Sequence, residues 1–136
     1  MRHINLIVLH HSDSDIKSHD DISVIKEWHL ARGFSDVGYH YFIKRNGQIQ
    51  KGRDLGIAGA HCKGVNGRSV GICLHGRDKF TELQFRSLEI LIYNVWGRIG
   101  FKCDVHPHNR YADKTCPVFD VKQFMKDYVE SNSEIV

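Results

Sequence analysis

The 136-residue sequence contains no apolar run close to the ~20 residues that a membrane-spanning helix needs. It has only two prolines, no internal repeat and no Pro- or Ser-rich linker, so we expect one domain over residues 1–136. Basic residues exceed acidic ones by 19 − 16 = 3, but they form no Lys/Arg block that would indicate nucleic acid. These absences predict a soluble monomer with neither nucleic acid nor a stable membrane association among its partners.

The N-terminal sequence does not have the pattern of a secretory signal. The apolar stretch from Ile4 to Leu9 is short, and no small-residue cleavage site follows it. We therefore expect synthesis in the cytoplasm without a signal peptide. The four cysteines include no C-x-x-C pair, and in that compartment they favour reduced thiols or a metal-bound thiolate over a disulfide framework.

The elements that are present alternate between strand and helix patterns. Short apolar runs predict buried strands at 5–9 and 69–74, and Asn46-Gly47 predicts the turn of a hairpin over 39–51. Helices are expected from Asp20 or Asp21 to Gly33 with Trp28 on the inner face, after a capping box at Thr81, and after Asp120. The region 105–117 is polar and predicted to be irregular. This order indicates an α/β domain with a central mixed β-sheet flanked by helices.

Ten histidines beside four cysteines make a metal site the leading functional hypothesis. His10 ends the first strand, and His108 and Cys116 lie eight residues apart in the late polar region. Three such ligands would leave the fourth position of a catalytic zinc open. Spacing alone is weak evidence, because a strand-end histidine is often satisfied by backbone groups, and His106 is a rival ligand to His108.

Five ordered motifs carry a more specific signal. They are Ile7-Val8-Leu9-His10-His11-Ser12, Asp36-Val37-Gly38-Tyr39-His40-Tyr41, Gly59-Ala60-His61-Cys62-Lys63-Gly64, Ser69-Val70-Gly71-Ile72, and His108-Asn109 followed by Lys114-Thr115-Cys116-Pro117. Together they resemble the zinc-dependent N-acetylmuramoyl-L-alanine amidases, most of all the small phage lysozyme type, which is related in fold to the peptidoglycan recognition proteins. The resemblance covers residues of about 4–128.

The resemblance implies one catalytic Zn²⁺ held by His10, His108 and Cys116, with Tyr39 and Lys114 as catalytic side chains. It implies hydrolysis of the amide bond between N-acetylmuramic acid and L-alanine, with peptidoglycan or a muropeptide as the substrate. A phage or prophage endolysin of this kind acts on the cell wall after release, which calls for a pore-forming lysis partner. His61 lies in a loop that borders the substrate groove in such folds, and it is a candidate substrate-binding residue.

Other functions remain open at this point. The same fold serves non-catalytic peptidoglycan-binding modules, although many of those lack the cysteine ligand. A cytosolic amidase that recycles soluble muropeptides would need no route across the membrane. A structural zinc site would need a fourth ligand such as Cys62 or Cys73. Arg110 stands where phage relatives commonly have an acidic residue, which leaves open what surrounds His108.

Overall fold

Five strands form one mixed sheet at the centre of the computed structural model, which describes residues 2–131. The strands are β1 (Leu6–His11), β2 (Tyr41–Ile43), β3 (Ile49–Lys51), β4 (Ser69–Leu74) and β5 (Asp104–Pro107). Their order across the sheet is β3-β2-β4-β1-β5. β1 runs parallel to both of its neighbours, β4 and β5, and β2 runs parallel to β4. β3 is antiparallel to β2, its partner in the predicted hairpin.

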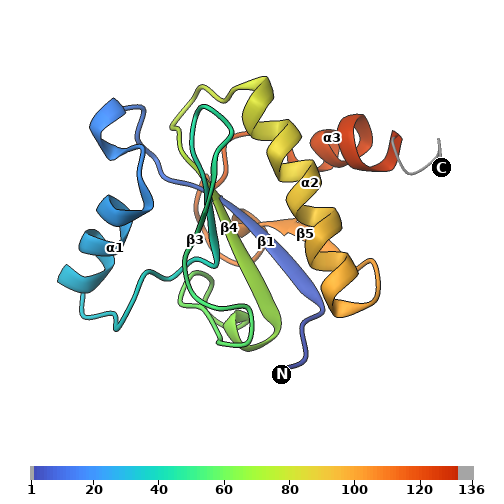
Figure 1. Cartoon of the computed structure of the whole chain (residues 1–136), viewed down its shortest axis with the longest axis horizontal. Coiled ribbons are helices and arrows are strands. Elements are labelled where there is room, and N and C mark those ends of the chain that lie inside the picture. The colour runs from blue at the N-terminus through green and yellow to red at the C-terminus, as the bar shows by residue number, and fades with distance from the viewer. Residues whose placement is uncertain (1, 132–136) are drawn as a thin grey trace.

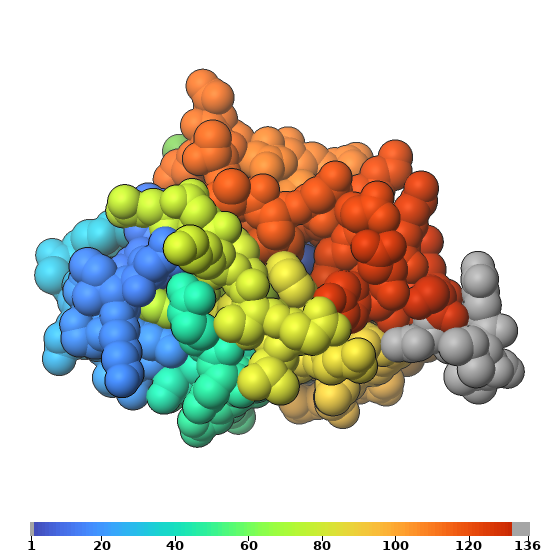
Figure 2. Space-filling view, turned by 90° about the horizontal axis from the view of Figure 1, so that it is seen from above, coloured from blue at the N-terminus to red at the C-terminus, as the bar shows by residue number. Residues whose placement is uncertain are grey.

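Helices cover both faces of this sheet, as Figure 1 shows. α1 (Ile22–Ala31) packs on one face, where Ile25 belongs to the same buried cluster as Phe42 and Cys73. The opposite face is covered by three segments: α2 (Glu82–Ile99), α3 (Val121–Phe124) and the π-helical continuation of α3 over Met125–Glu130. Seen from above in Figure 2, the blue segment that contains the start of α1 and the red C-terminal helices lie at opposite ends of the molecule.

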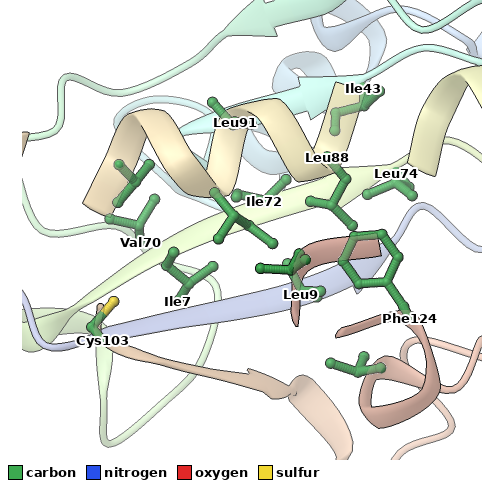
Figure 3. Close-up of a cluster of buried hydrophobic side chains, with 14 of the residues drawn as sticks. Ile7, Leu9, Ile43, Val70, Ile72, Leu74, Leu88, Leu91, Cys103 and Phe124 are labelled. Carbon is green, nitrogen blue, oxygen red and sulfur yellow. The ribbon is translucent and has the colours of Figure 1, made fainter. Parts of the chain in front are cut away.

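The larger core lies between the sheet and α2 (Figure 3). Because side chains alternate along a strand, Ile7 and Leu9 enter this core, whereas Leu6 and Val8 belong to a cluster on the other face. α2 contributes an apolar stripe at helical spacing, made of Leu88, Leu91, Ile92 and Val95. The same alternation places His10 on the face away from α2, at the C-terminal end of a central parallel strand.

The predicted helix boundaries are confirmed by their capping interactions. Asp21 accepts a hydrogen bond from the backbone of Ser23 at the start of α1, and Gly33 follows that helix with a left-handed φ of 93°. At the start of α2, Thr81 and Gln84 form the reciprocal capping box. Asp120 caps α3 by accepting from the backbone of Gln123.

Two local predictions are wrong. Residues 105–107, the start of the region expected to be irregular, belong to the edge strand β5, which pairs with β1 along Leu6–Leu9. An edge strand with partly exposed side chains needs no apolar alternation, so its sequence carried little signal. Trp28, expected to face inward, is 39% exposed and instead packs edge-on against the His19 ring. Among the described residues, none of the helices is both long enough and apolar enough to cross a membrane.

Candidate metal centre

The structure brings together His10, His108 and Cys116, the three residues predicted to bind metal. One possible ligand atom from each lies within 4.8 Å of the others. Nδ1 of His10 is 3.9 Å from Sγ of Cys116, and the rings of His10 and His108 have centroids 4.5 Å apart. The site forms at the carboxyl ends of parallel strands, where α/β sheets commonly bind their ligands.

The loop that carries two of these residues is held by the backbone. The Asn109 N–H donates to the Cys116 carbonyl at 2.8 Å, which closes the loop between the two ligands. The His11 N–H donates to the Cys116 sulfur at 3.4 Å, which ties this loop to the end of β1. The His11 ring lies on the other side of the strand, stacked on Phe80, as strand alternation predicts.

The donor set fits a metal ion. Nδ1 of His108 is buried and has no hydrogen-bond partner among the described residues, which is costly unless a further group binds there. Burial lowers the pKa of His10 and of His108, so both imidazoles are neutral near pH 7 and can act as ligands. Burial also raises the pKa of the Cys116 thiol to about 11, and the positive charge of Lys114 partly opposes this shift. Two imidazoles and one sulfur are ligands that zinc prefers.

Tyr39 and Lys114 share a cavity with two of the candidate ligands. The cavity has a volume of about 390 Å³ and is lined by His11, Asp13, Tyr39, His108, Lys114, Thr115 and Cys116. The rings of Tyr39 and His10 have centroids 5.0 Å apart. Burial raises the pKa of Tyr39 well above its usual value, so its phenol stays protonated at neutral pH and can donate a hydrogen bond.

His61 lies behind His10 and is not among the residues that line the cavity. Its Nδ1 is 2.9 Å from Nε2 of His10, and burial lowers its pKa to about 3. The substrate contact predicted for His61 stays a prediction, because the contact that the structure shows is with a candidate ligand.

The rival ligands do not join the cluster. Nδ1 of His106 is 2.6 Å from the hydroxyl of Tyr111, on a neighbouring part of the loop. Within residues 2–131, the group of side chains with metal-ligand spacing contains neither His106 nor Cys62 nor Cys73. The cluster therefore offers three protein ligands, as an open catalytic site does. Arg110 is exposed at the end of the 3₁₀ turn His108–Arg110.

Asp13 is a cavity residue that sequence analysis missed. It follows the end of β1 with a left-handed φ of 59°, a conformation that Asp tolerates better than most residues. Its carboxylate accepts a hydrogen bond from the Arg77 guanidinium at 3.2 Å. The run Ser12-Asp13-Ser14-Asp15 directly after a strand is a turn signal that would have drawn attention to this position.

Comparisons with known proteins show what the chain is similar to. The family model described as N-acetylmuramoyl-L-alanine amidase matches residues 1–119. The endolysin of Enterobacteria phage K11 is 36% identical over 123 residues, which are 83% of this chain and 81% of that protein. The amidase LysC from Clostridium intestinale superposes with a TM-score of 0.83 at 29% identity, covering 93% of this chain and 85% of that one. Peptidoglycan-recognition protein LB of Drosophila melanogaster is 35% identical over 94 residues, 65% of this chain and 40% of its own length.

Proposed function

Since the chain belongs to the N-acetylmuramoyl-L-alanine amidase family, we propose that it uses one zinc ion, held by His10, His108 and Cys116, to hydrolyse the amide bond between N-acetylmuramic acid and L-alanine in peptidoglycan. The observation that carries this proposal is the convergence of the three ligand atoms within 4.8 Å beside a cavity lined by Tyr39 and Lys114. Similarity to phage endolysins supports the cell wall as the place of action.

A zinc ion held by His10, His108 and Cys116 would supply an acidified water molecule and would polarise a carbonyl oxygen. The side chains around it have complementary tasks. The protonated Tyr39 hydroxyl can orient the attacking water by a hydrogen bond. The Lys114 ammonium can stabilise the negative charge that develops on the carbonyl oxygen of the scissile amide. The C–N bond of the amide breaks as the water oxygen bonds to the carbonyl carbon. A proton from that water passes to the nitrogen, which leaves as the free amino group of L-alanine.

The experiment is a digestion of purified cell walls by the purified chain. We expect about one zinc per chain, a loss of turbidity, and new N-terminal alanine in the digest. Cys116→Ser is the control, because it removes the thiolate ligand while changing only one atom. If the wild-type chain releases no stem peptides although zinc is bound, it is a binding module rather than an amidase.

A recycling amidase and a lytic amidase differ in the substrate that they hydrolyse. Intact sacculi and soluble muropeptides should be compared at matched concentrations of the scissile bond. Hydrolysis of soluble fragments alone would overturn the endolysin assignment. The pore-forming partner, the cytoplasmic synthesis, the monomeric state and the single domain over 1–136 stay predictions.

A further inference from the structure

The two ring nitrogens of His10 face different partners. Nδ1 lies 3.9 Å from the Cys116 sulfur, on the side of the candidate metal centre. Nε2 lies 2.9 Å from Nδ1 of His61, on the side of the sheet. The rings of His10 and His61 meet edge to face, with an interplanar angle of 86°. His61 therefore contacts the nitrogen that a metal ion bound at Nδ1 would leave free.

His61 is itself held from three directions. Its Nε2 lies 3.3 Å from the hydroxyl of Ser69 at the start of β4. Its backbone N–H donates to the side-chain oxygen of Asn66 at 2.9 Å. Its ring lies over Gly71, where an added Cβ would come within 2.5 Å of the ring carbon Cγ. Gly59 also lies close against this ring, because a Cβ added there would be only 2.7 Å from its Cδ2 atom.

These contacts define a directional chain of hydrogen bonds. A neutral imidazole carries its proton on one nitrogen and accepts on the other. A His10 that binds metal through Nδ1 must carry its proton on Nε2, and this proton then points at Nδ1 of His61. His61 in turn carries its proton on Nε2, within reach of the Ser69 hydroxyl.

We propose that His61 is a positioning residue that fixes the tautomer and the ring orientation of His10, so that Nδ1 of His10 is preset to bind the metal. This inference rests on the proposed zinc site but goes beyond it, since it gives His61 a task without contact to substrate. A hydrogen-bond acceptor behind a metal-binding histidine also makes the imidazole a better ligand. Such partners typically change metal affinity by about 10- to 100-fold.

The first experiment measures zinc affinity by competition with a chromophoric chelator. His61→Leu fills the space of the imidazole ring but removes the Nδ1 atom that accepts the hydrogen bond from His10. We therefore expect zinc to bind about 10- to 100-fold more weakly. His61→Asn can present its amide oxygen near the position of Nδ1, and it should keep most of the affinity. The absorption spectrum of the Co²⁺-loaded protein should shift in His61→Leu more than in His61→Asn. Equal zinc affinity and equal spectra for wild type and His61→Leu would overturn the inference.

A second experiment moves the His61 ring without changing its chemistry. Gly71→Ala places a methyl group against the ring and should lower zinc affinity in the same direction as His61→Leu. Gly67→Ala is the matched control, because its added Cβ meets no atom within 4 Å. Should His61→Leu fail to fold, Ser69→Ala decides the matter. Ser69→Ala removes the hydroxyl that orients His61, so we expect it to weaken zinc binding several-fold, and wild-type affinity in Ser69→Ala would overturn the inference.

Failure of this inference is distinguishable from failure of the proposed function. A wild-type chain that binds no zinc contradicts the proposed metal centre. A wild-type chain that binds zinc and cleaves cell walls, beside a His61→Leu variant with unchanged zinc affinity, leaves the amidase intact and rejects only the role of His61.

Discussion

The ring of Tyr39 lies 5.0 Å from the ring of His10, tilted by 56°, and also lines the cavity beside Lys114. Tyr39→Phe would keep this ring and remove only the hydroxyl. We expect the turnover rate on purified cell walls to fall by about 100-fold or more, because a positioned proton donor or acceptor contributes at that scale. Zinc content should not change. Tyr41→Phe is the control, since its ring packs against the core under α2. Equal loss of activity in both variants would argue for a packing effect.

Lys114 is exposed at the mouth of the same cavity. Lys114→Met would remove the charge and keep most of the side-chain length. The turnover rate should fall by about 100- to 1,000-fold when zinc is saturating, as it does when one group that stabilises an oxyanion is lost. Lys122→Met, an exposed lysine of α3, should leave the rate unchanged. A wild-type rate in Lys114→Met would show that the developing charge is stabilised by other groups.

His40 makes the fold sensitive to acid. Burial lowers its pKa from 6.5 to about 4, while its Nδ1 accepts from the Gly71 N–H and its Nε2 lies 2.8 Å from the Ile57 carbonyl. The unfolded chain thus binds a proton at higher pH than the folded chain does. The free energy of unfolding should therefore fall as the pH drops from 6.5 to 4, by about 3 kcal/mol from this group.

The measurement is urea unfolding of the metal-free protein at several pH values in this window. His40→Asn can still accept from Gly71 but does not titrate there, so its stability should decline less steeply than that of the wild type. Parallel pH curves for the two proteins would contradict this account of His40.

The stability of the larger core depends on the inner face of α2. Leu88 of α2 is fully buried against the sheet. Its truncation to alanine should cost about 2–5 kcal/mol in the free energy of unfolding. Ile90, two residues further along the helix, is 58% exposed. Ile90→Ala should change stability by at most about 0.5 kcal/mol. Chemical denaturation of both variants checks the difference, and similar costs would mean that α2 is oriented differently.

Patterns that depend on near neighbours in the chain allowed correct predictions. The strand 69–74 matches β4, because a strand buried on both faces is a short apolar run bounded by glycines. The capping box at Thr81 placed the start of α2 for the same reason: its hydrogen bonds join residues three positions apart. β5 was missed, since an edge strand pairs on one side and tolerates polar residues.

The candidate site depends on contacts between residues far apart in the sequence, which local patterns do not predict. Spacing within one loop left His106 as a rival to His108, which the family resemblance favoured. In the folded chain the pairing of β1 with β5 and the closed loop bring His108, and not His106, beside His10 and Cys116. The contact between His61 and His10 spans 51 positions and has no local pattern. One signal was nevertheless present: a glycine within a buried strand, here Gly71, often marks the close approach of another group.

The order of the ligands along the chain also sets when the centre can form during synthesis. His10 is made early, but Cys116 follows it by 106 residues, and both strands beside β1 are made later than β1 itself. A ribosome adds about 5–20 residues per second, so roughly 5–20 s pass between the two ligands. The nascent chain therefore carries the first candidate ligand long before the other two are made, and a metal ion held by all three, as proposed here, can bind only after the late loop has been translated.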